Sequence, residues 1–353
     1  MNFKKFVYTF IGFSFFCLFA ILAFNCYVDP ANLVRNKNID YAVSNMINGK
    51  GIIKLVNTDE RIFVKKLINE SNKMPETIVL GSSRSMGISK TFFDDDRLFF
   101  NYSVSGADIR DYISIWFTFL SHFKSEPQKI IFGLDPWIFN NNANDSRWES
   151  LSDEYYDACL LIELDVDAKK KCSFSYIKKI KELLSISYLK ESLKLKKENI
   201  VPEAVAVTDS RKETVIMPDG WRKYGTEFNN ISKNLVEKRV NSYISGNIYK
   251  LNEYQDLDTY KFEKFIRYLK GNNIEIIFYL PPYHPKVYSY MLNKSQYKNV
   301  ENAEIFLRNF ALENKIKVYG SYNPKKCGVN SQDFADGMHM KASGYQKIFF
   351  NKI

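Results

Sequence analysis

Two short segments, far apart in the chain, carry the residue types of a serine nucleophile and its base. The first reads LGSSRS at residues 80–85, and the second reads DGMH at residues 336–339. A serine hydroxyl needs a base to take its proton, and the base needs a neighbour that holds its tautomer and stabilises its charge. Asp336 and His339 supply both groups from one loop. The pattern predicts nucleophilic catalysis by a serine of the first segment.

Histidine is scarce, so the candidate base has few competitors. Besides His339, the chain contains only His122 and His284. His122 lies in an amphipathic aromatic segment, which favours a structural role. His284 follows a predicted strand, and we expect it to line the site. With three His, and five Cys at no zinc-ligand spacing, we predict neither a metal nor another cofactor.

The composition is that of a folded globular protein with a surplus of basic residues. Of 353 residues, 45% are apolar and 25% are charged, and 28 Phe with 23 Tyr exclude a largely disordered chain. Five Cys are too few for a small fold built on disulfides. The formal net charge of +10 suggests nucleic acid, an anionic membrane or an acidic polymer as partner.

The amino-terminal segment sets the compartment. Phe6 to Val28 contains no charged residue, and at about 1.5 Å per residue it can cross a bilayer core of about 30 Å. Lys4 and Lys5 precede it, so we expect the rest of the chain to lie outside the cytoplasm, where nucleic acid is not a partner. A cleavable signal peptide is the alternative. Residues 23–26 lack a suitable cleavage site, which favours an uncleaved single-pass anchor.

Short apolar runs that end at turn residues alternate with helical patterns through much of the chain. This alternation predicts a three-layer α/β/α sandwich with a mainly parallel sheet. The predicted strands are 77–80, 99–102, 129–132, 274–280 and 315–319, and the predicted helices are 108–123, 258–269 and 300–313. Ligands bind beyond the carboxyl ends of strands in such sheets, and the serine segment directly follows the first predicted strand.

One long stretch breaks this rhythm. We interpret 141–256 as a largely helical insertion or subdomain. The cytoplasmic flank and the anchor occupy 1–28, and a juxtamembrane, helical lead-in occupies 29–75. The catalytic domain consists of 76–140 and 257–353. Lys169 to Glu198, inside the insertion, holds ten Lys and three Glu. This lysine-rich segment is either a solvated helix face or a contact for anionic lipid or glycan. Cys159 and Cys172 are the only close pair of Cys beyond the anchor region, and a disulfide between them after export is a hypothesis.

The sequence resembles the SGNH, or GDSL-type, hydrolase superfamily, whose motif blocks occur here in family order over residues 77 to about 350. The block normally read Gly-Asp-Ser matches residues 81–83 and implies Ser83 as the nucleophile. The second block implies Gly106 as an oxyanion-hole donor. The last block, Asp-x-x-His, matches Asp336 and His339. The resemblance implies an SGNH, flavodoxin-like sandwich.

The third block departs from the family pattern, because Asp135 stands where the family has asparagine. Asparagine donates an N–H to the oxyanion, which an ionised aspartate cannot do. Asp135 either has another role, or is held protonated and completes the oxyanion hole, or is replaced by a donor such as Arg84 or Asn101. We also expect Arg84, Asn101, Trp137 and His284 to bind substrate.

The anchor, the GSSR form of the first block and the LPPYH segment look like membrane-anchored SGNH proteins of bacterial cell-surface acylation, of the DltD-like and AlgJ/AlgX-like groups. This likeness implies a serine acyltransferase or esterase for O-acyl groups, mainly acetyl, of a cell-surface polysaccharide. It also implies a membrane-bound O-acyltransferase as partner and a catalytic domain on the outer side of the cytoplasmic membrane. A simple extracytoplasmic esterase or thioesterase, and a non-catalytic partner with a decayed site, stay open as alternatives.

Overall fold

The large sheet is parallel throughout. In the computed structural model its order is β3 (Phe99–Asn101), β2 (Thr77–Leu80), β4 (Lys129–Gly133), β8 (Glu275–Leu280) and β9 (Lys317–Gly320). The structure describes residues 3–29, 34–93, 96–143, 145–165, 180–198, 200–208, 211–246, 248, 250–251, 254 and 256–350. The chain is thus an α/β protein, as predicted, with all five predicted strands present.

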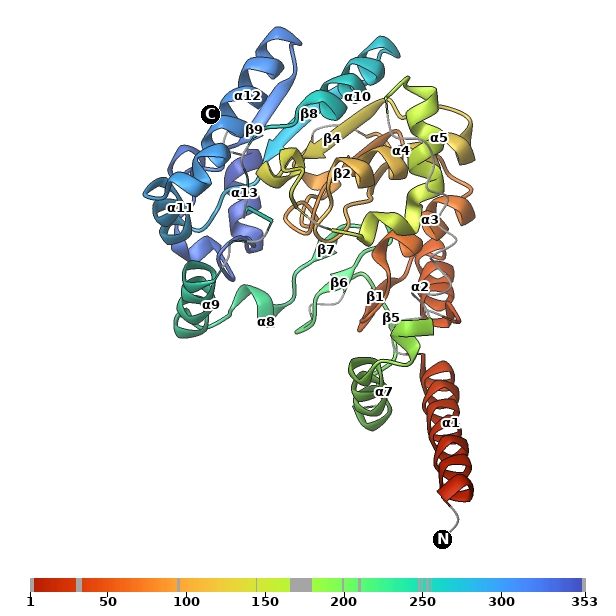
Figure 1. Ribbon diagram of the computed structural model, residues 1–353. Coiled ribbons are helices and arrows are strands. Elements are labelled where there is room, and N and C mark those ends of the chain that lie inside the picture. The colour runs from red at the N-terminus through yellow and green to blue at the C-terminus, as the bar shows by residue number, and fades with distance from the viewer. Residues whose placement is uncertain are drawn as a thin grey trace.

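The inner strands β2, β4 and β8 bury side chains on both faces, which explains their nearly continuous apolar sequences. On one face, Ile78, Ile130 and Phe278 join a large core. This core includes the inner sides of α4 (Ile109–Phe123), α10 (Tyr260–Gly271) and α12 (Lys298–Glu313). On the other face, Val79 and Ile131 belong to a smaller core that includes α13 (Ala342–Phe350). Helices therefore cover both faces of the sheet (Figure 1).

The helices that cover the large core follow from amphipathic sequence and local capping. Helix α4 begins at a capping box, in which the Asp108 side chain accepts the N–H of Arg110 and Asp111 reaches back to the N–H of Asp108. It ends at Lys124, which adopts a left-handed backbone conformation. The helices predicted at 108–123, 258–269 and 300–313 correspond to α4, α10 and α12, with ends that differ by one or two residues.

A second sheet was not predicted. It is antiparallel, in the order β5 (Glu203–Val205), β1 (Gly51–Ile53), β6 (Val215–Ile216) and β7 (Arg222–Lys223). Strands of two or three residues are too short to show an alternating pattern in the sequence. The largely helical insertion therefore also supplies three strands, of which β5 and β6 pair with β1 of the lead-in and β7 pairs with β6.

Further helices complete the fold. These are α2 (Lys37–Ile47), α3 (Glu60–Glu70), α5 (Ser152–Leu161), α8 (Thr226–Asn229), α9 (Lys233–Ser245), α11 (Pro285–Leu292), and short 3-10 helices at Lys90–Phe92, Pro136–Phe139, Arg147–Leu151, Ser295–Tyr297, Pro324–Cys327 and Ser331–Asp333. Cys159, on α5, has a free thiol whose pKa burial raises to about 11. Its predicted partner, Cys172, and the first part of the lysine-rich segment lie outside the described residues.

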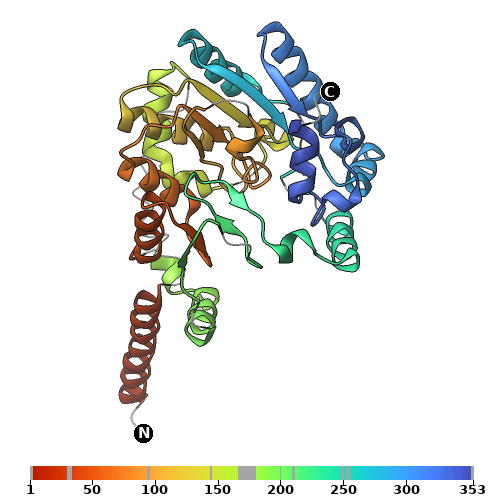
Figure 2. The same ribbon diagram turned by 180° about the vertical axis from the view of Figure 1, so that it is seen from behind.

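The apolar amino-terminal segment forms one helix, α1 (Phe3–Val28), with a mean hydropathy of 2.2 over its most apolar window. By length and composition it is able to cross a membrane, a property that signal sequences share. It projects away from the rest of the molecule, with α7 (Ile186–Glu198) beside it (Figures 1 and 2).

Candidate active site

The structure brings together the serine, histidine and aspartate that the sequence singled out. Ser83 Oγ lies 2.9 Å from His339 Nε2, and His339 Nδ1 lies 2.8 Å from Asp336 Oδ2. Ser83 lies in the turn directly after β2, and the other two residues lie in the loop before α13. All three are partly exposed, so a ligand can reach them. The order of contacts is that of a nucleophile, a base and an orienting carboxylate.

Asp336 also shapes the loop that carries it. Its Oδ1 accepts the backbone N–H groups of Met338 and His339, both at 2.8 Å. Burial alone would raise the pKa of Asp336, but the bonds from the His339 ring and from these two N–H groups outweigh burial and hold the pKa below its ordinary value. Asp336 is therefore an anion at neutral pH and can stabilise a positive charge on His339.

The turn that presents Ser83 depends on very close packing at the ends of two strands. The N–H of Ser85 donates to the carbonyl of Ser82 at 2.9 Å, which closes the turn. The Ser85 side chain then lies against Gly81 and Gly133. A Cβ atom on Gly133 would lie 1.7 Å from Ser85 Oγ, and one on Gly81 would lie 2.6 Å from it. Only glycine fits at these two positions, because any side chain would displace the turn.

Arg84 ties the serine turn to three other segments. Its side chain is 1% exposed and donates to Asp135 Oδ1 at 2.7 Å. It also donates to the carbonyl of Met338 at 3.2 Å, and to those of Pro281 and Pro282 at 2.6 and 2.7 Å. The guanidinium lies 4.0 Å from the centre of the Tyr283 ring. Arg84, which follows Ser83, thus binds Met338, which precedes His339, and the two segments that follow β4 and β8.

Asp135 is an acceptor in the protein interior. It is fully buried, and its carboxylate pairs with Arg84. Burial raises the pKa of Asp135, and the Arg84 charge opposes this shift. The sequence left several roles open for Asp135. The contact with Arg84 supports a role other than that of an oxyanion donor. The aspartate supplies the counter-charge for Arg84.

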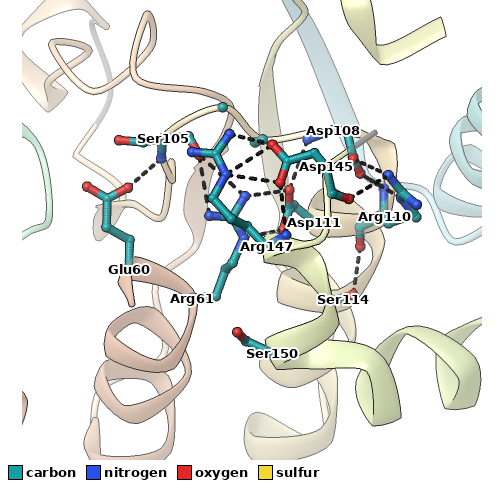
Figure 3. A network of polar contacts seen from close by, with 12 residues as sticks. Glu60, Arg61, Ser105, Asp108, Arg110, Asp111, Ser114, Asp145, Arg147 and Ser150 are labelled. Carbon is teal, nitrogen blue, oxygen red and sulfur yellow. Dashed lines mark hydrogen bonds and ion pairs between the residues drawn. The ribbon is translucent and has the colours of Figure 1, made fainter. Parts of the chain in front are cut away.

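In its loop, Gly106 follows Ser105, which a polar network holds in place (Figure 3). Its φ of 59° is in the left-handed region that favours glycine. The Lys250 ammonium donates to the Gly106 carbonyl at 2.7 Å, and both terminal nitrogens of Arg61 donate to the Ser105 carbonyl at 3.3 Å. Just before this loop, the N–H of Val104 donates to the Gly81 carbonyl at 3.0 Å. This bond keeps the loop beside the start of the serine turn.

Two buried Arg–Asp pairs therefore support the site. Besides Arg84–Asp135, the second is Arg61–Asp111, in which two parallel hydrogen bonds of 2.7 and 2.8 Å join the side chains. Nothing in the sequence predicted Arg61 or Lys250 as supporting residues, because their partners are 50 and 144 positions away. A buried arginine on an otherwise amphipathic helix leaves no periodic signal.

The four residues expected to bind substrate are tied to protein atoms. Asn101 donates to the carbonyls of Ser85 and Ile88, both at 3.0 Å, and Trp137 Nε1 donates to the Ala107 carbonyl at 3.0 Å. Arg84 is committed to the contacts above. The structure therefore gives these three side chains the environment of positioning residues, and their contact with substrate stays a prediction.

His284 and His122 lie in different settings. The N–H of His284 donates to the Gly337 carbonyl at 3.0 Å, and its Nδ1 accepts the N–H of Lys286 at 3.2 Å. Burial lowers the pKa of His284, so its ring is neutral at pH 7. The backbone N–H of His284 thus helps to hold the loop that carries His339. His122, near the end of α4, has Nε2 3.0 Å from the Ser71 carbonyl, and Ser71 is the residue that ends α3.

Comparison with known proteins places the chain in a family without assigning it a reaction. No curated protein matches the sequence. Among the described residues, no group of three or more His, Cys, Asp and Glu side chains is arranged to hold a metal ion. Residues 39–350, which include every residue of the candidate site, match the family described as "Protein of unknown function (DUF1574)", and the chain belongs to this family.

Proposed function

We propose that the protein is a membrane-anchored serine acyltransferase or esterase of the SGNH type, acting on O-acyl groups of a bacterial cell-surface glycopolymer. One observation carries the proposal, namely the continuous contact from Ser83 Oγ through the His339 ring to Asp336 at 2.9 and 2.8 Å. The parallel sheet supports it, because Ser83 follows the carboxyl end of a central strand, where ligands bind in such sheets. The order of the motif blocks supplies the SGNH assignment.

The proposed reaction has two steps. His339 Nδ1–H donates to Asp336, which leaves Nε2 free to accept the Ser83 proton. Ser83 Oγ forms a bond to the carbonyl carbon of an ester, and the carbonyl oxygen becomes an oxyanion. The carbon–oxygen bond to the leaving group then breaks, and the leaving oxygen takes the proton from His339. An acyl group is now attached to Ser83.

The second step returns the enzyme to its starting state. His339 takes a proton from water or from a sugar hydroxyl, and the resulting oxygen attacks the acyl carbon. Ser83 Oγ leaves and regains its proton from His339. We assign oxyanion stabilisation in both steps to the backbone N–H groups of Ser83 and Gly106, and each such donor contributes about 3–4 kcal/mol. Arg84 and Asp135 then act as positioning residues.

The cellular setting is part of the proposal. Helix α1 would be retained as an anchor, with Lys4 and Lys5 in the cytoplasm and the catalytic domain outside. The likeness to cell-surface acylation proteins supports acetyl as the acyl group and a membrane-bound O-acyltransferase as the partner that supplies it.

Ser83→Ala tests the catalytic proposal. The variant should fold like the wild type and lose turnover of a short acyl ester by a factor on the order of 10⁴ or more, because the nucleophile is gone. Turnover of p-nitrophenyl acetate by the full chain in detergent measures this effect.

Ser82→Ala is the matched control. Ser82 Oγ is buried and accepts the N–H of Arg84 at 3.1 Å, so its loss should reduce stability by about 1 kcal/mol and turnover by less than about tenfold. A fluorophosphonate probe should label the wild type and Ser82→Ala at Ser83. Absence of labelling in the wild type would refute the catalytic proposal and favour a non-catalytic partner of the acyltransferase.

A further inference from the structure

Helix α7 is joined to the end of α1 by buried polar contacts. Asn25 is the one fully buried residue of α1, all of which the structure describes. Its side chain donates to the Leu183 carbonyl at 2.7 Å and accepts from Ser192 Oγ at 2.8 Å. One turn further on, the Tyr188 hydroxyl donates to Asp29 at 2.9 Å. An amide in an apolar anchor is costly unless its hydrogen bonds are made, and here α7 and Leu183, just before it, make them.

The height of this junction places α7 at a membrane surface. Counted from Phe6 at about 1.5 Å per residue, α1 reaches Asn25 after roughly 30 Å, which is the thickness of a bilayer core. The Lys196 ammonium lies 5.6 and 5.9 Å from the ring centres of Phe24 and Tyr27, as expected where aromatic and basic residues meet lipid headgroups. Figures 1 and 2 show α7 alongside α1, apart from the two sheets.

The outer face of α7 combines apolar and basic side chains. Ile186 is 73% exposed and Leu193 is 55% exposed, while Lys190 and Lys197 lie on the same face at helical spacing. The described residues 180–198 contain five Lys and three Glu. Exposed Ile and Leu between lysines are unfavourable in water but suit the boundary between acyl chains and anionic headgroups, where lysine stems cover apolar surface.

We infer that α7 is a second membrane contact, which lies in the headgroup region of the outer leaflet beside α1 and binds anionic phospholipid. The inference rests on the proposed retention of α1 and is independent of the proposed catalysis. Asn57 connects α7 to the body of the protein, because its side chain donates to Glu191 at 2.9 Å. Three residues later, Glu60 begins α3, whose Arg61 holds the Ser105 carbonyl. Lipid contact by α7 would therefore set the orientation of the candidate site toward the membrane.

Tryptophan quenching by brominated lipid tests this contact. The full chain carries Leu193→Trp or, as a matched control, Leu312→Trp, since Leu312 is an 80% exposed leucine on α12. Both variants are reconstituted into vesicles of brominated phosphatidylcholine, with and without phosphatidylglycerol. We expect quenching of the tryptophan at 193, stronger with phosphatidylglycerol, and none beyond the wild-type background at 312. Equal behaviour of the two tryptophans would overturn the inference.

Charge reversal tests the choice of lipid. A lysine near an anionic surface contributes about fivefold to lipid partition. Lys190→Glu with Lys194→Glu and Lys197→Glu should therefore remove the phosphatidylglycerol-dependent quenching at 193, as should salt at about 1 M. The same change at the exposed Lys73, Lys298 and Lys315 should leave it intact. Quenching at 193 that is identical in both vesicle types would overturn the assignment to anionic phospholipid.

Retention of α1 is measured separately in the same samples. All variants should float with the vesicles and resist carbonate extraction, because α1 is sufficient to anchor the chain even when α7 does not bind lipid. Release of the chain by carbonate would instead refute the anchor. Loss of vesicle quenching together with binding of the charged face to a soluble polyanionic glycan would assign that face to a polymer and overturn the lipid assignment.

Discussion

The two buried Arg–Asp pairs around the candidate site have the same chemistry but different connections. In both, the closest nitrogen and oxygen are 2.7 Å apart, and neither arginine is more than 3% exposed. Arg61 meets Asp111 through two parallel hydrogen bonds, and Asp111 also accepts the N–H of Asp108 at the start of α4. The Arg84 side chain donates one hydrogen bond to Asp135 and one to each of three backbone carbonyls.

This difference separates local from long-range support. The Arg61–Asp111 pair fixes one helix start and the loop that precedes it. Arg84 instead joins segments whose positions along the chain differ by as much as 254 residues, including the two that carry Ser83 and His339. The loops of Ser83 and His339 come from distant parts of the sequence, and a connection such as Arg84 keeps them within hydrogen-bond distance. The position of Gly106 depends only on its own loop.

Arg84→Met should have the largest effect on stability. The change leaves the Asp135 carboxylate buried without its charge partner, which costs about 3–5 kcal/mol of the free energy of unfolding. Chemical denaturation of the full chain in detergent measures the loss. Arg84→Met combined with Asp135→Leu should recover part of it, because no buried charge is then unpaired. A double variant that is less stable than Arg84→Met would contradict this account of the pair.

Arg61→Met should have a smaller effect, about 2–3 kcal/mol, because Asp111 keeps the N–H of Asp108 and the favourable field at the N-terminus of α4. The same denaturation experiment compares the two arginines directly. Turnover should separate them further, since Arg84→Met displaces both Ser83 and His339 while Arg61→Met displaces only the Ser105–Gly106 loop. A loss for Arg61→Met equal to that for Arg84→Met would remove the distinction between local and long-range support.

The smallest expected effect is the change of stability with pH. Burial alone would raise the pKa of Asp145, but bonds from Arg147 and Lys250 hold it below its ordinary value. The contribution of Asp145 to the free energy of unfolding is therefore complete above the pKa of the unfolded state, about 4, and is lost as the pH falls through the pKa of the folded state. Asp135 has the opposite shift, so the folded protein binds its proton more readily and stability gains as the pH falls toward 4.

Stability measured against pH for two variants makes this contrast visible. As the pH falls, the free energy of unfolding of the wild type should decrease relative to that of Asp145→Asn, mainly below pH 4. Relative to that of Asp135→Asn it should increase, and this change should occur above pH 4. The two aspartates thus report on the Gly106 network and on the Arg84 connection respectively. Parallel curves for the two variants would show that the carboxylates share one environment.

The sequence predicted the parts of the molecule that rest on local patterns. The strand at 77–80 was predicted with the observed bounds because Thr77 and the three apolar residues after it form a short run that stops before Gly81, and all four are buried. Ser83, Asp336 and His339 were identified because their types and spacing carry chemistry. The Asn25–Ser192 contact joins residues 167 positions apart. It leaves no trace in periodicity, because one asparagine does not change the apolar character of α1.

The contact between Ser83 and His339 also determines when the site can exist. These residues are 256 positions apart, and β8 and β9, which complete the large sheet, lie between them. At 5–20 residues per second, a ribosome needs roughly 13–50 s to pass from one to the other. During that interval β2, β3 and β4 are already available to pair, yet the serine has no base. In the proposed mechanism the nascent chain is therefore inactive until the last loop of the site has emerged, and Ser83 is synthesised long before it can react.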